Sequence, residues 1–384
     1  MPTIVVDGEE ESVLEDDEQT MRPKDVAVQQ QRVYAWHPIL DPEWVIYSFL
    51  ILAVIMIPVG FKLESLSNGV VELRTVYDGV DSSDQLCGIG TRYNANETCT
   101  LQFEAPEDMK PPVLIHYELS NFYQNHRSYV DSRDDFQLAG RSSGQDSVSA
   151  QACDPLNKLG NITLNPCGFI ANTFFNDVFT LRPGALDING DELVMVEEGI
   201  AWQTDLEYRF AMPDGYQQLP CDVCDATCCQ NYGFSCKTPA ISKKDGVCYA
   251  YDYPFDDTTQ YLYETYPNII SPLEHVTNEH FVVWMRVATR PQFRKLYGYI
   301  EQTIPKGTRF LIDINLNYVV ESFGGTKALI ISTNTIVGGK NPYIGPTFYY
   351  IGFFSLFCGV FFAIKHWFSP RKIADRKYLH YKEE

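Results

Sequence analysis

Motifs that carry enzyme chemistry are missing from this sequence. It contains no glycine-rich phosphate loop, no His-Glu-x-x-His and no Gly-x-Ser-x-Gly. The seven histidines are dispersed, and His126, which lies in a polar, arginine-rich stretch, has no nucleophile or substrate pocket in the pattern around it. These absences predict a protein that is not an enzyme and that binds no cofactor.

Positive charge is also scarce. The chain has 30 Lys and Arg against 50 Asp and Glu, so its formal net charge is −20, which argues against a nucleic-acid partner. Part of the acidity lies in EEESVLEDDE at residues 9–18, which has few apolar groups to bury. Residues 1–28 are therefore predicted to be a disordered, acidic cytosolic tail, whose regulatory or docking role stays open.

Two long apolar runs without a charge stand out among the features that are present. They cover Val45–Phe61 and Ile344–Ile364. At about 1.5 Å of rise per residue, each run crosses most of a hydrocarbon core about 30 Å thick. Buried helices of a soluble protein are the alternative, but soluble helices of this length carry a polar face. We therefore expect transmembrane helices at residues 45–61 and 344–364.

Charges beside these runs predict the orientation of the chain. The tail at 365–384 carries six Lys or Arg, whereas the opposite flanks of the two runs carry few. By the positive-inside rule, both termini are cytosolic and residues 62–341 are luminal or extracellular. No small-residue cleavage site follows the first run, so we interpret it as an uncleaved signal anchor, preceded by a membrane-proximal segment at 29–44. The six basic residues are Lys365, Arg371, Lys372, Arg376, Lys377 and Lys382.

Cysteines and glycosylation acceptors gather between the two runs. Ten of the eleven cysteines lie there, as do the two Asn-x-Ser/Thr acceptors at Asn96 and Asn161. An oxidising lumen favours disulfides between such cysteines, and sequons there are candidates for glycosylation. The segment is therefore predicted to be a glycosylated, disulfide-stapled ectodomain. Its cysteines are Cys87, Cys99, Cys153, Cys167, Cys221, Cys224, Cys228, Cys229, Cys236 and Cys248.

The last six of these cysteines, within residues 221–248, allow two interpretations. The spacing that starts with Cys221-x-x-Cys224 suits a zinc site. In an oxidising lumen the same spacing favours disulfides. Cys228 and Cys229 are neighbours, and a ring between adjacent cysteines is strained, so each should pair elsewhere. We expect three disulfides and no metal, and the pairing stays open.

Alternating hydrophobic patterns predict strands in the ectodomain. Val113–Leu119, Phe310–Tyr318 and, more weakly, Val71–Tyr77 place apolar residues at every second position. This spacing is typical of half-buried strands in an antiparallel sheet. Helices are expected at Asn121–Asp135 and Pro291–Gln302. The predicted fold class is a membrane protein with two transmembrane helices and a large, β-rich, antiparallel sandwich-like α+β ectodomain.

Neither apolar run has an ionisable side chain in its centre. Transporters and channels usually carry polar groups at membrane depth, so two such helices cannot form a transport pathway alone. This composition favours an accessory subunit of a larger membrane complex. Two other classes stay open: a receptor-like or adhesion ectodomain that binds another protein, and a membrane-bound luminal enzyme.

Several segments then point to one family. Tyr117–Gly140, with the sequence YELSNFYQNHRSYVDSRDDFQLAG, strongly resembles the signature of the cell division control protein 50 family. Five further segments resemble the family in the same order, and the resemblance covers nearly everything from Gln29 to Tyr381. The segment Cys221–Cys248 departs from the family pattern and looks like an insertion. The five further segments are Ala35–Leu40, Asn165–Asp177, Gly199–Phe210, Trp284–Tyr297 and Gly338–Gly345.

This family, also called the ligand-effect modulator family, comprises the non-catalytic β-subunits of type IV P-type ATPases, which are phospholipid flippases. The resemblance implies a subunit needed for the ATPase's exit from the endoplasmic reticulum, its stability and its transport cycle. It implies the ATPase catalytic subunit and membrane lipids as partners, in the endoplasmic reticulum, Golgi, endosome or plasma membrane. It also implies the disulfides Cys87–Cys99 and Cys153–Cys167.

Partner contacts are expected from the ectodomain and from the membrane-proximal stretch Gln29–Leu40, because apolar helices alone give little specificity in a bilayer. Asn121–Arg133 is the first candidate in the ectodomain, since dense polar and aromatic side chains suit a wet protein interface. The alternative is that these residues brace the fold, above all Asn121 and Tyr123, which border a strand. The candidate contact residues are Trp36, Pro38, Asn121, Phe122, Tyr123, Asn125, Arg127 and Arg133.

Overall fold

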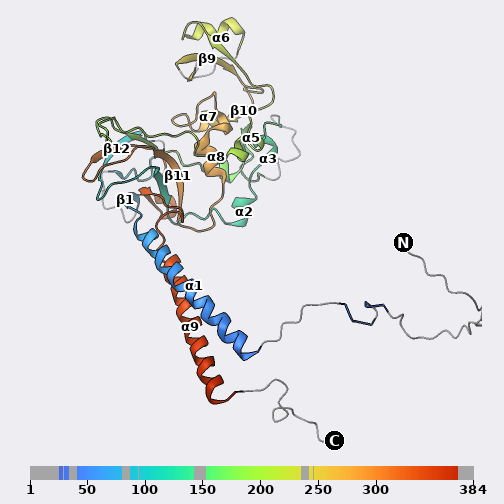
Figure 1. Cartoon of the computed structure of the whole chain (residues 1–384). Coiled ribbons are helices and arrows are strands. Elements are labelled where there is room, and N and C mark those ends of the chain that lie inside the picture. Colours follow the sequence, from blue (N-terminus) through green and yellow to red (C-terminus); the bar gives the residue numbers. More distant parts are fainter. Residues whose placement is uncertain are drawn as a thin grey trace, which may run out of the picture. The chain divides into compact units, whose positions relative to one another are not determined.

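The structure, a computed structural model, describes residues 26–28, 30–33, 41–79, 87–93, 95–141, 153–234, 242–244 and 246–370. The chain divides into two compact units. Residues 56–351 form the larger unit, which holds all of the β-sheets (Figure 1). The smaller unit combines the chain up to Ile55 with the chain from Gly352 onward.

Helices α1 (Pro42–Asn68) and α9 (Ile344–Phe368) contain the two apolar runs, and both are long and apolar enough to cross a membrane. Within the larger unit they approach each other at Gly345. A Cβ added to Gly345 would lie 2.5 Å from the Cβ of Glu64, which is closer than real Cβ atoms come. Glycine is therefore needed for this approach of the two helices.

The largest sheet has four antiparallel strands in the order β1-β13-β3-β11. The central strand β3 spans Val113–Leu119, which confirms the strand predicted there from alternating hydrophobicity. Val113 pairs with Thr333 of β13 on one side and with Ile300 of β11 on the other. The strands are β1 (Glu72–Gly79), β3 (Val113–Leu119), β11 (Phe293–Ile300) and β13 (Thr326–Thr333).

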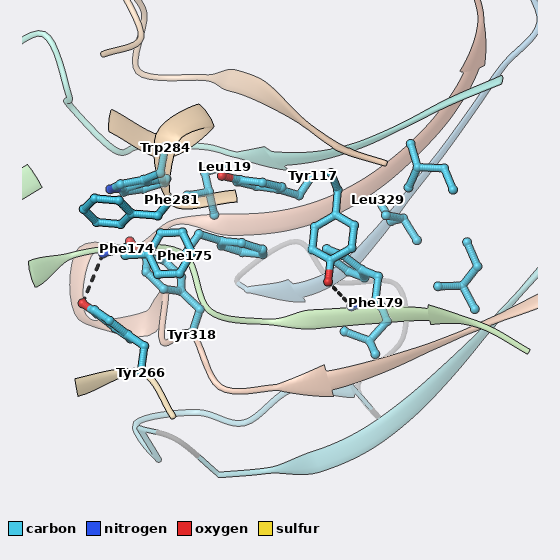
Figure 2. Close-up of a cluster of buried hydrophobic side chains, with 14 of the residues drawn as sticks. Tyr117, Leu119, Phe174, Phe175, Phe179, Tyr266, Phe281, Trp284, Tyr318 and Leu329 are labelled. Carbon is cyan, nitrogen blue, oxygen red and sulfur yellow. Dashed lines mark hydrogen bonds between the residues drawn. The ribbon is translucent and has the colours of Figure 1, made fainter. Parts of the chain in front are cut away.

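A second antiparallel sheet, in the order β2-β12-β6, shares one hydrophobic core with the first sheet. The ring of Phe179 on β6 lies 6.1 Å from Tyr77 on β1 and 4.7 Å from Tyr297 on β11. Figure 2 shows this aromatic core, in which the backbone nitrogen of Phe174 donates to the Tyr266 hydroxyl over 3.2 Å. The two sheets therefore pack as a β-sandwich. The strands of the second sheet are β2 (Glu97–Glu104), β6 (Val178–Leu181) and β12 (Arg309–Leu316).

Two small sheets extend the sandwich. One has the order β10-β5-β4, and its β5–β10 pair is parallel, unlike the antiparallel pairing expected from the sequence. The other, β7-β9-β8, belongs with α6 to the cysteine-rich segment, which has a small core of its own. The strands are β4 (Lys158–Leu159), β5 (Ile162–Asn165), β10 (Thr259–Tyr261), β7 (Gln217–Cys221), β8 (Ser242–Lys244) and β9 (Val247–Asp252).

The predicted fold class is confirmed: two apolar helices flank a β-rich, disulfide-bonded ectodomain. Short helices complete the ectodomain between the strands. They are α2 (Arg127–Val130), α3 (Asp135–Leu138), α4 (Phe169–Asn172), α5 (Gln203–Tyr208), α6 (Ala226–Tyr232), α7 (Leu262–Thr265), η3 (His275–Thr277), α8 (Glu279–Met285) and η4 (Glu321–Phe323).

The helix predicted at Pro291–Gln302 is wrong, because Phe293–Ile300 forms strand β11. Lys295 concealed the alternating pattern of this strand. Its side chain is buried, and its Nζ is satisfied there by donating to the carbonyls of Val283 (3.0 Å) and Trp284 (2.8 Å) near the end of α8. A polar residue therefore occupies an inward-facing position of β11, where the alternating pattern of a strand requires an apolar one.

The helix predicted at Asn121–Asp135 is largely wrong as well. Only Arg127–Val130 is helical before α3 begins at Asp135. Asn121 has a left-handed backbone, with φ of 57°, and its side-chain nitrogen donates to the carbonyl of Phe323 in η4. Asn and Asp side chains that bond to backbone groups compete with helix formation.

A buried ion cluster links the two sheets of the sandwich. The Nζ of Lys327, on β13, lies 2.8 Å from Asp177 Oδ2 and 3.0 Å from Asp78 Oδ2, and all three residues are buried. The same amine donates to the carbonyl of Tyr318 over 2.6 Å, and the Tyr77 hydroxyl donates to Asp177 over 2.9 Å. A buried charge needs such partners, so this cluster holds together segments that are far apart in sequence.

His275, in η3, is fully buried between aromatic rings. Its ring lies 5.6 Å from Tyr253 and 5.4 Å from Tyr261, and among the described residues neither ring nitrogen has a hydrogen-bond partner. Burial without a partner disfavours the charged imidazolium and lowers the pKa of His275 to about 3. The folded ectodomain therefore holds a neutral histidine.

Candidate interaction surface

The candidate contact segment Asn121–Arg133 leaves the end of β3 and is anchored by Phe122. The Phe122 ring lies 5.3 Å from Phe323, 5.7 Å from Tyr129 and 5.8 Å from Trp284. These contacts hold the ring against the main core, where it is only partly exposed. Phe122 therefore positions the segment.

Asn121 and Asn125 are exposed, but both side chains bind the chain's own backbone. Asn121 Nδ2 donates to the carbonyl of Phe323 over 2.6 Å, and Asn125 Nδ2 donates to the carbonyl of Thr289 over 3.1 Å. Gln124, which is buried between them, accepts from the backbone nitrogen of Ala288 over 2.8 Å. The two asparagines fix the loop, and only their outer faces are open to a partner.

Tyr123 and Arg127 are two strongly exposed members of the described candidate set. Tyr123 is 56% exposed and the Arg127 side chain is 94% exposed. Arg127 pairs with Asp131 over 3.4 Å, an exposed i,i+4 pair that contributes little to stability. Arg133 is less accessible, because its side chain is 29% exposed and lies 3.1 Å from Asp135. The structure thus divides the predicted set into bracing and exposed residues.

Ser132 and Gln137, near the end of the segment Tyr117–Gly140, hold the Cys153–Cys167 loop in place. The sequence did not predict this role. Ser132 Oγ accepts from the backbone nitrogen of Phe169 over 2.9 Å, and Gln137 Oε1 accepts from that of Cys167 over 2.8 Å. Asp134 caps α3 by accepting from the backbone nitrogens of Phe136 (2.8 Å) and Gln137 (3.4 Å). An Asp before a short helical stretch was the available signal for this cap.

Four disulfides join cysteines within the described residues: Cys87–Cys99, Cys153–Cys167, Cys221–Cys228 and Cys224–Cys248. Cys229 is also disulfide-bonded, Cys236 lies outside the described residues, and Cys358 in α9 is a free thiol. No group of three or more His, Cys, Asp or Glu residues in the described chain is placed to hold a metal.

Both glycosylation acceptors lie on the surface of the larger unit. Asn96, just before β2, is exposed, and its side-chain oxygen accepts from Asn315 Nδ2 over 2.6 Å. Asn161 is exposed in the turn between β4 and β5. The remaining candidate contacts, Trp36 and Pro38, lie outside the described residues.

The family model of the LEM3 (ligand-effect modulator 3) family / CDC50 family matches residues 63–372, which include all of the ectodomain except its first residue and all of α9. The chain belongs to this family. The match confirms the family resemblance drawn from the motifs of the sequence. The cysteine-rich segment at 221–248 lies inside the bounds of this match.

Named relatives in the CDC50 family match the chain over most of its length. Cell cycle control protein 50A of Bos taurus is 35% identical over 348 residues, or 89% of this chain and 88% of the relative. ALA-interacting subunit 3 of Arabidopsis thaliana is 32% identical over 363 residues, or 93% and 90%. Phospholipid-transporting ATPase accessory subunit CRF1 of Saccharomyces cerevisiae is 29% identical over 390 residues, or 95% and 90%.

Proposed function

We propose that this chain is the non-catalytic accessory β-subunit of a phospholipid-transporting type IV P-type ATPase, and that the catalytic subunit of that ATPase is its main partner. The observation that carries the proposal is family membership, together with a relative that is named as an accessory subunit and aligns with 95% of the chain. The polar ectodomain surface around Tyr123 and Arg127 supports a protein partner.

The apolar helices support an accessory role. No Asp, Glu, Lys, Arg or His lies between Trp44 and Phe61 of α1 or between Ile344 and Ile364 of α9. Polar groups at membrane depth mark most lipid and ion pathways, so these two helices lack the side chains that transport requires. The partner therefore translocates the lipid. This chain contacts membrane lipids only because they surround its two helices.

The proposed topology places both termini in the cytosol and residues 62–341 in the lumen. It is supported by the six basic residues after α9, the disulfides and the exposed Asn96 and Asn161. Protease added outside intact microsomes should remove a C-terminal tag, and endoglycosidase should shift the protein on a gel. A protected tag or an unshifted band would contradict this topology.

We further propose that the luminal ectodomain assists the ATPase in the endoplasmic reticulum. The disulfide-bonded ectodomain folds in the lumen, where its exposed polar face is available to luminal loops of a newly made partner. We infer that this pairing stabilises the ATPase, permits its exit and supports its transport cycle. If an ATPase left the endoplasmic reticulum normally in cells without this chain, that part of the proposal would fail.

Replacing Arg127 by Glu should lower the amount of ATPase that co-purifies in mild detergent. We expect about a tenfold loss, equivalent to a contact of about 1.4 kcal/mol. The side chain is 94% exposed and its ion pair is weak, so glycosylation and the unfolding midpoint should stay unchanged.

Arg309→Glu is the matched control for this experiment. Its side chain is 69% exposed and pairs with Glu104 over 2.9 Å on the second sheet. It should leave co-purification unchanged. An Arg127→Glu variant that binds the ATPase like the wild type would remove Arg127 from the interface, and one that misfolds without a partner would make the segment structural.

A further inference from the structure

An exposed aromatic and basic surface lies beside the candidate contact segment, on α3 and α5 and on the residues that directly follow them. Phe136 of α3 is 59% exposed and Tyr208 of α5 is 73% exposed. Both residues line a pocket of about 260 Å³, together with Arg141 and Arg209. We name these four residues the α3–α5 surface. Large aromatic side chains at this exposure indicate a surface that a partner covers.

The chain holds the walls of this pocket in fixed positions. The backbone nitrogen of Ala211 donates to the carbonyl of Leu138 over 2.9 Å, and that of Asp214 donates to the carbonyl of Gly140 over 2.8 Å. Gly140 has φ of +72°, and a Cβ added there would lie 2.2 Å from the carbonyl oxygen of Met212. The ends of α3 and α5 are thus joined side by side, as Figure 1 shows. A fixed surface loses less conformational entropy when a partner binds.

Positive charge is in excess at this surface. The buried carboxylate of Asp205 lies 2.6 Å from Arg286 Nε and 3.5 Å from an outer nitrogen of Arg209, so two guanidinium groups share one carboxylate. Asp135, which also lines the pocket, is already paired with Arg133 over 3.1 Å. A pocket with surplus guanidinium charge favours an anionic group, above all a carboxylate.

The size and composition of the pocket indicate the kind of occupant. A volume of about 260 Å³ lies below the range of roughly 300–1,000 Å³ that is usual for small-molecule sites. It suits one side chain better than a whole ligand. Tyr and Arg are also the residues most enriched in the energetic centres of protein interfaces. A protein loop therefore fits these observations better than a lipid headgroup.

We propose that the α3–α5 surface receives an Asp or Glu side chain from a luminal loop of the ATPase catalytic subunit, with the carboxylate against Arg141 and Arg209 and the loop between Phe136 and Tyr208. This inference rests on the proposed function. It adds a second contact area next to Tyr123 and Arg127. Phe136, Tyr208 and Arg209 belong to two segments that resemble the family, and Arg141 directly follows the first of them. The carboxylate replaces water at the guanidinium groups and is stabilised by charge-assisted hydrogen bonds.

The test uses the full chain co-expressed with its ATPase. Arg141→Glu and the double variant Phe136→Ala/Tyr208→Ala should each lower co-purification about tenfold, with the unfolding midpoint and the disulfides unchanged. Tyr232→Ala, on the exposed face of α6, and Arg309→Glu on β12 are the matched controls and should bind like the wild type. Exchanging one luminal Asp or Glu of the ATPase for Lys should restore binding to Arg141→Glu.

Each outcome of this test has one meaning. If both surface variants co-purify as much ATPase as the wild type does, the inference is overturned but the proposed function stays intact. Failure of the wild-type chain to co-purify with any ATPase overturns the proposed function itself. A water-soluble short-chain phosphatidylserine separates the lipid source: if it binds the wild type but not Arg141→Glu, and ATPase binding is unchanged, the surface is a lipid site and the inference fails.

Discussion

Replacing Lys327 by Met should cost about 3–5 kcal/mol of ectodomain stability, the expected cost of leaving a buried charge without its partner. The Nζ of Lys327 lies 2.8 Å from Asp177 and 3.0 Å from Asp78, and all three residues are buried. Methionine keeps the length of the side chain but leaves two buried carboxylates uncompensated. Urea unfolding of the purified chain in mild detergent measures the loss, and retention in the endoplasmic reticulum reports it in cells.

Two further variants separate the charge effect from the change in shape. Lys306→Met removes an exposed lysine and should change stability by less than about 0.5 kcal/mol. Adding Asp78→Asn and Asp177→Asn to Lys327→Met removes the orphaned charges and should recover part of the loss. If the Lys327→Met variant were as stable as the wild type, the cluster would not be a structural link between the two sheets.

The ectodomain should lose about 2 kcal/mol of stability between pH 7 and pH 5 because of His275. Burial lowers the pKa of this histidine to about 3 in the folded chain, whereas an unfolded histidine titrates near 6.5. Between these two pH values His275 binds a proton in the unfolded chain but not in the folded chain. The contribution is therefore fully present above pH 6.5 and is lost steadily as the pH falls towards 3.

Removing the titrating ring at position 275 tests this expectation. His275→Phe keeps an aromatic ring between Tyr253 and Tyr261, so the difference in unfolding free energy between wild type and variant should change by about 2 kcal/mol from pH 7 to pH 5. His126→Phe, at an exposed position, is the control and should keep the wild-type slope. Parallel pH curves for wild type and His275→Phe would contradict a neutral, buried His275.

Local patterns in the sequence predicted the parts of the fold that local chemistry decides. The strand Val113–Leu119 was placed with its observed bounds, because apolar side chains occupy every second position on a half-buried strand. The two apolar helices follow from length and composition alone. Strand β11 was missed because Lys295 is buried against carbonyls of α8, a contact that only the folded chain brings about.

The candidate surface was predictable in position but not in the role of each residue. Dense polar and aromatic side chains marked the stretch Asn121–Arg133. That Phe122 packs against Trp284 and Asn125 binds the carbonyl of Thr289 depends on segments about 160 residues further along the chain. The exposure of Tyr208 likewise depends on how α5 packs beside α3. The family resemblance covered the segment Gly199–Phe210, but it did not indicate that Tyr208 contacts a partner.

Reconstitution into liposomes tests the central claim most directly. The chain, its co-purified ATPase and the complex of both would each be supplied with ATP and a fluorescent phospholipid in the outer leaflet. The account predicts that the chain alone neither hydrolyses ATP nor moves lipid, and that the complex does both faster than the ATPase alone. ATP hydrolysis or lipid translocation by the chain alone, or equal activity of the ATPase with and without it, would contradict the account.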